Sequence, residues 1–436
     1  MNAQPQAGHR TLVIAHGHPD FSIGGAEIAA YNLFKAYQGH KDVGDAWFLA
    51  RGGQTHPPSG AISLWRHREY LWEQGTGDFF FHRTVNLRSW LREFSEFLRS
   101  VAPDVVHVHH YLHLGLEFLR VIRRANPRAH LFLTLHEYFA ICHSSGQMVK
   151  RDSFRLCSRE SPLDCNRCFP EYSTEDFWLR KQYIRRAFDL VDHFISPSHF
   201  LRQRYIDWGI APERISVIEN GQADFDPLPP RPITEGEVRN RFAFFGQINE
   251  FKGLDVLLEA LRALPKASRK SLIVEIHGTG LETQSEAFRN RIEELRAPLV
   301  KQGVVRWVGP YQPADVGRRM SKIDWVLVPS LWWENSPMVI QEAFTHGRPV
   351  ICANIGGMAE KVRDGIDGLH FEARNPLDLA DTLLRAMEPG MWDRLRERFQ
   401  PSITYKECAA SHLALLTNRR SSRGSARSML APQSSA

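Results

Sequence analysis

Short, continuous apolar runs alternate with amphipathic helical stretches along almost the whole chain. The runs are rich in Val, Ile, Leu and Phe without polar alternation, which predicts strands buried on both faces of a parallel sheet. Residues 27–37, 254–264 and 286–300 are typical of the helices between them. Repeated strand–helix units of this kind indicate doubly wound α/β sheets. The predicted strands span residues 11–16, 105–109, 131–135, 193–196 and 215–218 in the first half, and residues 242–246, 272–277, 304–308, 325–329 and 350–352 in the second.

A proline-rich stretch divides this pattern into two halves. Residues 223–239 contain Pro227, Pro229, Pro230 and Pro232 and almost no periodic pattern, so they predict an extended, semi-rigid linker. The sequence therefore predicts two α/β domains, over residues 1–222 and 240–392. Two or three domains also agree with the length of 436 residues.

The end of the chain differs in composition from these domains. Pro401 breaks a helical stretch, and Thr404 and Glu407 match a capping box that opens another amphipathic helix. Residues 393–418 are thus predicted to form C-terminal helices. Residues 419–436 are rich in Ser, Arg and Gly and poor in apolar side chains, which predicts a disordered tail.

Composition and charge exclude several classes of protein. Hydrophobic residues make up 43% and charged residues 24%, as in ordinary folded proteins. No apolar run approaches the roughly 18 residues of a membrane-spanning helix, and the first ten residues lack the apolar core of a secretory signal. Four arginines follow Asn418 without an acid, and removing them from the formal charge of +6 leaves +2, which disfavours a nucleic-acid partner. Six cysteines and no signal predict a reducing, cytoplasmic compartment.

The segment from residue 328 to residue 343 is the most informative. A buried strand ends near Ser330, and a helix is predicted to begin at Ser336 and Pro337, a favoured N-cap and a favoured first helical residue. The free amides of Met338 and Val339 would then point at the carboxyl edge of the sheet, beside the positive end of the helix dipole. This arrangement predicts a phosphate site.

Two carboxylates accompany the predicted phosphate site. Glu334 lies in the loop before the helix and Glu342 on its second turn, so both can face one cleft and contact different parts of a ligand. Two glutamates alone more often belong to a solvated surface. The loop, N-cap and proline between them favour a ligand site instead.

Three further segments follow predicted strands and carry candidate ligand-binding residues. Lys252 lies at a predicted helix start, where a cation opposes the helix dipole unless it faces a bound anion. Gly24 and Gly25 open another helix and permit close backbone approach to a ligand. His136 follows strand 131–135, at the sheet edge where open α/β sheets bind ligands.

Together these motifs resemble those of family-4 glycosyltransferases with the GT-B fold. The resemblance covers residues 11–418 and implies two Rossmann-like domains that face each other across a cleft. The C-terminal half would bind a nucleotide sugar and the N-terminal half an acceptor. The C-terminal helices, residues 393–418, would return to the N-terminal domain, with the final helix crossing back to it. The residues that carry the resemblance are Glu334 and Glu342, Lys252 and Gly253, the segment from Gly356 to Glu360, the segment from Gly24 to Glu27, and Asn220 with Gly221.

The resemblance implies a role for each matching residue of the donor site. Glu342 would bind the two ribose hydroxyls, and Glu334 would contact the donor sugar. After Ser336 and Pro337, the amides of Met338 and Val339 would hold the diphosphate.

The chemistry implied is transfer with retention of anomeric configuration and without a catalytic metal. Lys252 would neutralise the departing diphosphate, which is the main electrostatic contribution. Gly24 and Gly25 would admit the β-phosphate, and His136 would lie beside the reacting sugar. Where the family usually has an arginine, this chain has Gln247, which removes one cation expected at the diphosphate.

Four cysteines follow His136 in one short segment: Cys142, Cys157, Cys165 and Cys168. Such a cluster in a reducing compartment is typical of a structural zinc site. Only the last pair has the C-x-x-C spacing, and free thiols in a loop are the alternative. A second cluster, His107, His109, His110 and His113, follows a strand, where alternation scatters side chains to opposite faces and disfavours a metal. His109, at the strand end, is predicted to face the cleft.

Aromatic and basic residues mix between residues 79 and 99. Such a surface suits a lipid-linked acceptor and peripheral contact with the inner face of the membrane. Trp90, Phe94 and Leu98, however, form one helical stripe, which favours packing in the core.

Three functions follow from these features. We favour an enzyme that moves a sugar from a nucleotide diphosphate to a glycan or lipid-linked acceptor. A non-catalytic sugar-nucleotide-binding protein, acting as a sensor or assembly subunit, is the alternative that Gln247 supports. The joint presence of Glu334, Glu342, Lys252 and His136 opposes it. A zinc-ribbon nucleic-acid binder would need a basic body, which the near-neutral charge excludes.

Overall fold

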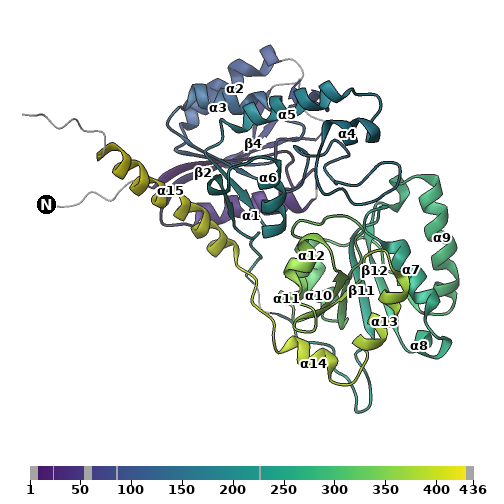
Figure 1. Ribbon diagram of the computed structural model, residues 1–436. Helices are drawn as coiled ribbons and strands as arrows, with labels where there is room; N and C mark the ends of the chain where they lie inside the picture. The colour runs from purple at the N-terminus through teal and green to yellow at the C-terminus, as the bar shows by residue number, and fades with distance from the viewer. Residues whose placement is uncertain (1–7, 23, 54–60, 85–86, 225–226, 429–436) are drawn as a thin grey trace, which may run out of the picture.

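The computed structural model describes residues 8–22, 24–53, 61–84, 87–224 and 227–428. They form two α/β lobes, with the N-terminal lobe in purple to teal and the C-terminal lobe in green (Figure 1). The last helix, in yellow, lies against the N-terminal lobe. The chain therefore crosses between the lobes twice.

The N-terminal lobe is built on an eight-stranded sheet with the order β10-β9-β8-β7-β1-β2-β4-β3. Neighbouring strands are parallel except β3 and β4, which are antiparallel. The strands are β1 (His9–Ala15), β2 (Val43–Arg51), β3 (Ile62–Arg66), β4 (Glu69–Trp72), β7 (Val105–His109), β8 (His130–Thr134), β9 (His193–Ser196) and β10 (Ile215–Val217), with a separate pair β5 (Thr76–Asp78) and β6 (Arg83–Thr84). The helices are α1 (Gly25–Gln38), α2 (Leu87–Val101), α3 (Glu117–Ala125), α4 (Pro162–Cys168), α5 (Thr174–Phe188) and α6 (His199–Trp208).

Residues of β1 alternate between two apolar cores. Leu12 and Ile14 pack in the core that includes residues of α2 and α3, whereas Val13 and Ala15 pack in the core that includes residues of α1. Because both faces of the sheet are covered, β1 has the continuous apolar sequence expected of a central parallel strand.

The C-terminal lobe contains a six-stranded parallel sheet with the order β13-β12-β11-β14-β15-β16. Numbered from its first strand, this is the 3-2-1-4-5-6 order of dinucleotide-binding folds. The strands are β11 (Arg241–Gln247), β12 (Ile273–Thr279), β13 (Val305–Trp307), β14 (Trp325–Val328), β15 (Val350–Ala353) and β16 (Gly368–Phe371). The helices are α7 (Leu254–Ala263), α8 (Lys266–Lys270), α9 (Glu286–Lys301), α10 (Val316–Met320), α11 (Met338–Thr345), α12 (Gly356–Lys361), α13 (Pro376–Ala386) and α14 (Met391–Arg396).

The ten strands predicted from apolar runs are present, each within two residues of its predicted ends. The apolar-run pattern did not predict β2, in which Gly44 and Asp45 precede the apolar run of residues 46–50, nor the short strands β3 to β6. It also missed β16, which begins with Gly368 and contains His370.

The two segments that cross between the lobes lie side by side. The Gln222 amide donates to the Ile403 carbonyl at 2.8 Å, and the Tyr405 amide donates to the Gln222 carbonyl at 3.1 Å. Gly221 is required here, because a Cβ would lie 2.6 Å from the Tyr405 Cα. The predicted linker contains no helix or strand among its described residues; positions 225–226 lie outside them.

Only one C-terminal helix returns to the N-terminal lobe. Helix α15 (Tyr405–Ser428) starts at the predicted capping box, since Thr404 and Glu407 each bond the other's backbone amide. Its Ala409 and Leu413 are buried in the core with α1. Residues 393–396 were predicted to return as well, but they belong to α14, which packs in the C-terminal core.

The backbone of α15 is helical to Ser428, where the sequence predicted disorder from residue 419. A helix that is already nucleated by docked turns extends at little cost per added residue. Residues 429–436 of the predicted tail lie outside the described residues.

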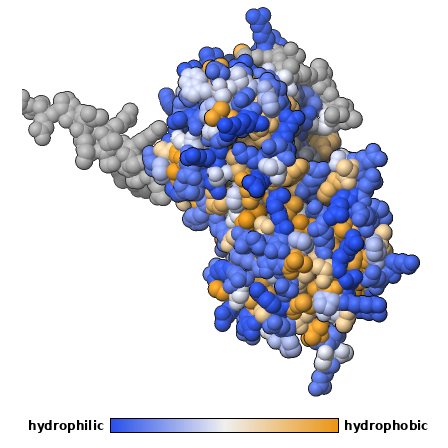
Figure 2. Space-filling model, turned by 45° about the vertical axis from the view of Figure 1, so that its right-hand side comes forward, coloured by the Kyte–Doolittle hydropathy of each residue, from blue (hydrophilic) through white to orange (hydrophobic). Residues whose placement is uncertain are grey.

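Helix α2 carries the aromatic stripe of the basic segment. Trp90, Phe94 and Leu98 are fully buried, so the stripe packs into the core; residues 85–86 of the basic, aromatic segment lie outside the described residues. On the face in Figure 2, hydrophobic residues are scattered among hydrophilic ones over both lobes. No helix in the described part of the chain is both long and apolar enough to cross a membrane.

Candidate active site

In each sheet the strand order reverses next to the first strand, between β1 and β7 and between β11 and β14. Open α/β sheets bind ligands outside the carboxyl ends of the strands at such a reversal. The segments that follow these strands contain four of the residues singled out from the sequence. They are Gly24 and Gly25 after β1, Lys252 after β11, and Glu334 after β14.

Lys252 and Glu334 meet at the reversal in the C-terminal sheet. The Lys252 Nζ lies 2.5 Å from Glu334 Oε1, and the same oxygen accepts hydrogen bonds from Ser330 Oγ at 2.8 Å and Trp332 Nε1 at 2.9 Å. The Glu334 side chain is 8% exposed. No described residue hydrogen-bonds Oε2, so this second oxygen is left for a ligand.

Glycines let the backbone segments of this site lie against one another. Gly253 has φ +69°, and a Cβ there would lie 1.9 Å from the Pro329 carbonyl oxygen. Gly357 donates its amide to the Glu334 carbonyl at 2.7 Å, and a Cβ there would lie 1.7 Å from the Asn335 carbonyl oxygen. Only glycine fits at either position, and the two contacts fix the loop that carries Glu334.

The helix after Glu334 begins differently from the prediction. Pro337, not Ser336, is the N-cap of α11, and no side chain caps this helix. The Ser336 hydroxyl is buried and has no hydrogen-bond partner among the described residues. Met338 and Val339 still form the first turn, so their amides lack an acceptor one turn earlier and are free to bind an anion.

The glycine turn of the N-terminal lobe faces this helix start across the cleft. A Cβ on Gly25 would lie 3.5 Å from the Met338 sulfur. A Cβ on Gly24 would lie 2.5 Å from Glu27 Oε2, because the Glu27 carboxylate lies against the turn. Both predicted glycines are therefore at the junction of the two lobes, beside the predicted phosphate site.

Glu342 is half-buried on α11, and no described residue donates a hydrogen bond to its carboxylate. Burial raises the pKa of this carboxyl group to about 7. Burial and, less strongly, the Glu342 charge raise the pKa of the nearby Tyr311 phenol. A half-buried carboxylate without donors is suited to accept hydroxyl hydrogen bonds from a ligand.

Histidines line the other side of the cleft. His136 Nε2 lies 3.1 Å from His109 Nδ1, which places the predicted His136 and His109 together. Burial lowers the pKa of His136 to about 3, so its imidazole is neutral. His107 points into the core instead, where its ring nitrogens bond Tyr37 and Thr134.

Two histidine–carboxylate pairs at this edge were missed by the sequence analysis. His16 Nε2 lies 3.3 Å from Glu27 Oε1, and His110 Nε2 lies 3.0 Å from Glu137 Oε1. The two histidine rings are 4.4 Å apart. Burial raises the pKa of Glu137 to about 8. His16 could have been found by the argument used for His136, because it directly follows the first strand.

Gln247 and the four cysteines make none of the contacts described above for the other predicted site residues. Gln247 is exposed at the end of β11. The cysteines are free thiols, and among the described His, Cys, Asp and Glu side chains no group of three or more is placed to hold a metal. Cys157 donates to the Arg159 carbonyl and Cys168 accepts from the Arg151 amide, each at 3.2 Å. Burial and, less strongly, the charges of Cys142 and Cys157 raise the pKa of Cys165, so these three thiols lie near one another, and the zinc site stays a prediction.

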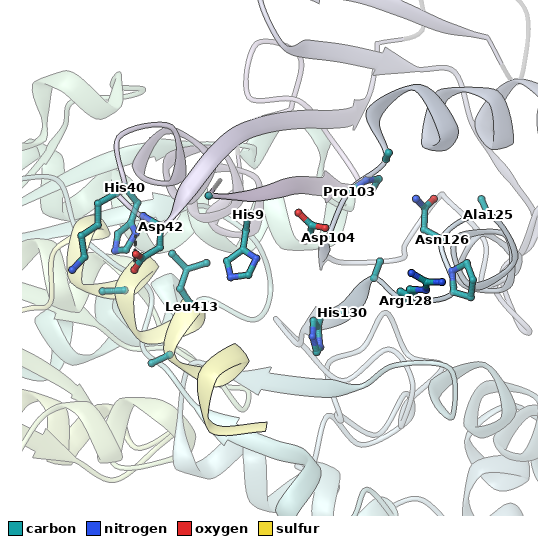
Figure 3. Close-up of a pocket in the computed structure, with 17 residues that line it drawn as sticks. His9, His40, Asp42, Pro103, Asp104, Ala125, Asn126, Arg128, His130 and Leu413 are labelled. Atoms are coloured by element: carbon teal, nitrogen blue, oxygen red, sulfur yellow. Dashed lines mark hydrogen bonds and ion pairs between the residues drawn. The ribbon is translucent and has the colours of Figure 1, made fainter. Parts of the chain in front are cut away.

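A cavity of about 960 Å³ lies at the opposite edge of the N-terminal sheet. Figure 3 shows His9, Asp104 and His130 around it, at the amino ends of β1, β7 and β8, with Leu413 of α15 alongside. The candidate site lies at the carboxyl ends of the strands. This cavity lies at their amino ends, so it is not part of the site. A second cavity, of about 550 Å³, lies at the carboxyl edge of the C-terminal sheet and is lined by Gly278, Gly309 and Pro310 among others.

Two family models match the chain. The model described as Glycosyltransferase Family 4 matches residues 1–222, and the model described as Glycosyl transferases group 1 matches residues 230–403. Together they cover both lobes and all of the site residues.

Curated relatives are named D-inositol 3-phosphate glycosyltransferase. The protein from Nocardioides sp. is 34% identical over 315 residues, which cover 68% of this chain and 61% of that protein. The protein from Geodermatophilus obscurus is 28% identical over 287 residues, which cover 64% and 58%. The chain thus spans less than two thirds of the length of either relative.

Solved structures share the fold. Sucrose-phosphate synthase from Thermosynechococcus elongatus superposes with a TM-score of 0.69 at 17% identity, over 94% of this chain and 99% of that one. Anabaena HepE in complex with UDP-glucose superposes with a TM-score of 0.60 at 17% identity, over 93% and 99%. These likenesses confirm the predicted GT-B fold of two Rossmann-like domains.

Proposed function

The chain belongs to glycosyltransferase family 4, and from this premise we propose that it transfers a hexosyl group from a nucleotide diphosphate to a glycan or lipid-linked acceptor, with retention of configuration. The observation that carries the proposal is the Lys252–Glu334 pair at the strand reversal, opposite the amino end of α11 and Gly25. The names of the curated relatives and the UDP-glucose held by HepE support it.

The diphosphate would lie between the Lys252 ammonium and the amides of Met338 and Val339. All three groups are fixed before the donor binds, since Lys252 is paired with Glu334 and the amides belong to a packed helix. Donors aimed in advance at developing negative charge lower the barrier more than donors that must reorganise. In this proposal the chain itself supplies the positive charge at the leaving group.

The sugar and ribose would contact different carboxylates. Glu334 Oε1 is occupied by its three donors, so Oε2 would accept a sugar hydroxyl. Glu342 would accept the two ribose hydroxyls, since its half-buried carboxylate has no donor from the described residues. Neutral His136 would lie on the sugar's other side and offer a hydrogen bond without adding charge.

The alternative is a protein that binds a sugar nucleotide without turning it over. Gln247 favours it, since an exposed amide stands where the family usually has a second cation for the leaving group. The two proposals differ in turnover and not in binding.

A thermal-shift panel of nucleoside diphosphates and their sugars tests binding. Donor at about 100 times its dissociation constant should stabilise the protein by roughly 2.7 kcal/mol. Release of nucleoside diphosphate from the stabilising donor then separates the two proposals. Binding with no release in the presence of sugar acceptors favours the non-catalytic protein, and no stabilisation by any member contradicts both.

A further inference from the structure

The residues on either side of Glu334 both reach across to the N-terminal lobe. Asn335 donates its amide Nδ2 to the His136 carbonyl at 3.1 Å and accepts from the Ser198 hydroxyl at its Oδ1, at 2.7 Å. Trp333 donates its indole Nε1 to the Cys157 carbonyl at 2.9 Å. The loop that carries the proposed sugar-binding carboxylate is therefore bonded to the opposite lobe on both sides.

The nitrogen and the oxygen of the Asn335 side-chain amide both bond the opposite lobe. Asn335 is 6% exposed and Ser198 is 0% exposed, so neither finds a solvent partner without opening the lobes. The amide orientation is unambiguous, because its oxygen faces a hydroxyl donor and its nitrogen faces a carbonyl. Ser198 also caps α6 through the Leu201 amide at 3.2 Å, which fixes the position of its hydroxyl.

A neighbouring contact supports the same interface. Glu360 of α12 accepts the amides of His199 and Phe200 at 2.8 and 2.7 Å, so the first turn of α6 is bonded from the other lobe. Trp333 also packs on Phe200, with ring centroids 5.1 Å apart. The interface is thus a set of directed bonds around one helix start, and Asn335 is its member nearest to Glu334 and His136.

We propose that Asn335 is a positioning residue that holds Glu334 and His136 at a fixed separation across the cleft. The inference rests on the proposed function, in which these two residues flank the donor sugar. The Asn335 amide bonds the peptide of His136, and Asn335 adjoins Glu334 in sequence, so one side chain connects these two residues across the cleft. Its loss would misplace the sugar-side groups while leaving the nucleotide-side groups, Met338, Val339 and Glu342, within one lobe.

Kinetics on Asn335→Ala test the catalytic consequence. Turnover per nucleotide-binding site should fall by roughly 10- to 100-fold, as expected when reacting groups shift by about 1 Å. The dissociation constant for the nucleoside diphosphate, measured by calorimetry, should stay within about threefold of the unmodified protein. Calorimetric stoichiometry counts folded sites, so a lower folded fraction cannot imitate the effect. Unchanged turnover per site, or a parallel loss of nucleotide affinity, would overturn the proposal.

A matched control variant and a double-mutant cycle test the same contact in two further ways. Asn375→Ala also removes an asparagine that accepts two hydrogen bonds, but these come from two backbone amides of its own helix in the C-terminal lobe, so turnover per site should not change. Combining Asn335→Ala with Ser198→Ala should cost no more turnover than Asn335→Ala alone, because both remove one shared contact. Independent, additive losses would contradict the shared contact. If Asn335→Ala does not fold, the isosteric Asn335→Asp replaces it, since a carboxylate would repel the His136 carbonyl.

Hydrogen exchange separates failure of this inference from failure of the proposed function. Without any donor, Asn335→Ala should exchange at least about threefold faster than the unmodified protein at residues 198–201 and 333–337. Asn375→Ala should not. Unchanged exchange would reject the contact between lobes even in an active enzyme. Faster exchange in a chain that turns over no nucleotide sugar would instead reject the proposed function and with it the catalytic part of this inference.

Discussion

At the scale of single residues, Glu334 Oε1 accepts three hydrogen bonds, from Lys252, Ser330 and Trp332. A buried carboxylate with one cation and two neutral donors is well satisfied, so the pair is stable before a ligand arrives. Gln247 lies only five residues before Lys252 but is exposed at a strand end. Two polar residues close in sequence therefore have very different environments.

Lys252 should matter far more than Gln247. Lys252→Ala removes the cation proposed to stabilise the leaving diphosphate and should lower kcat by roughly 100-fold or more. Gln247→Ala removes at most a hydrogen bond from an exposed amide and should cost much less. Steady-state kinetics with the donor found by thermal shift compare them. Equal losses would mean that Lys252 does not contact the diphosphate.

Glu342 should give donor binding a pH dependence. Because burial raises its pKa to about 7, the carboxylate that accepts ribose hydroxyls is present above that pH and is lost below it. The KM for the donor should therefore rise as pH falls through about 7, with kcat less affected. Glu342→Ala should raise KM by roughly ten- to a hundredfold at pH 8. Glu342→Ala should also remove the pH dependence of the donor KM. If that dependence survives the substitution, it belongs to another group.

Glu334 should behave differently from Glu342. It is proposed to lie beside a sugar ring that acquires positive charge, so it acts mostly in the transition state. Glu334→Gln should lower kcat and kcat/KM together. If Glu334→Gln raised only KM while Glu342→Ala lowered only kcat, the donor would lie in the reverse orientation.

At the scale of elements, the site depends on how strand ends and helix starts are joined. The turn from β11 into α7 passes directly under the end of β14, where the Gly253 Cα faces the Pro329 carbonyl. The turn into α12 passes over the loop of Glu334 and Asn335 in the same way, at Gly357. Neither contact follows from helix or strand propensity.

Gly253 and Gly365 provide a matched pair at the same φ of +69°. An alanine at Gly365 meets open space, so it should cost only the strain of about 1–2 kcal/mol, or roughly 2–8 °C in Tm. An alanine at Gly253 meets the Pro329 oxygen at 1.9 Å and must also displace the Lys252 loop. Its loss of Tm should be at least roughly twice as large, with lower turnover. Thermal unfolding of both variants measures the two losses of Tm. Equal losses would show that backbone strain, and not the contact with the Pro329 oxygen, determines the cost.

At the scale of the whole molecule, the lobes are joined by two crossing segments and by α15. This helix covers the face of the N-terminal sheet on which α1 also packs, and Leu413 and Leu416 are among its buried residues. The last described buried side chain of the chain is Leu416.

Two truncations should therefore differ sharply. A chain that ends at Asn418 should keep its stability and its turnover on a water-soluble acceptor, because it retains the buried residues of α15. A chain that ends at Ile403 exposes the apolar face of α1 and should lose Tm or aggregate. Thermal unfolding and gel filtration compare them. A loss of turnover in the longer chain would assign a role to residues 419–436.

The sequence by itself determined ten of the described strands, several helices, the two-domain division and the identity of the principal candidate residues. Apolar runs, proline breaks and capping boxes act over a few neighbouring residues, so β7, β9, α7 and the cap of α15 could be predicted locally. The resemblance added Lys252, Glu334, Glu342 and His136 as candidates. Local signals failed at β16, which begins with Gly368 and contains His370, and at β2, whose apolar run follows Gly44 and Asp45.

Only the tertiary structure decided which of these residues meet. Asn335 and His136 are 199 positions apart, and Lys252 and Glu334 are 82 apart, so their contacts depend on how the sheets and lobes are placed. Ser336 fits a helix cap by its sequence position but does not make that cap in the structure. Spacing along the chain fixes local conformation, whereas the meeting of distant side chains is set by packing over the whole molecule.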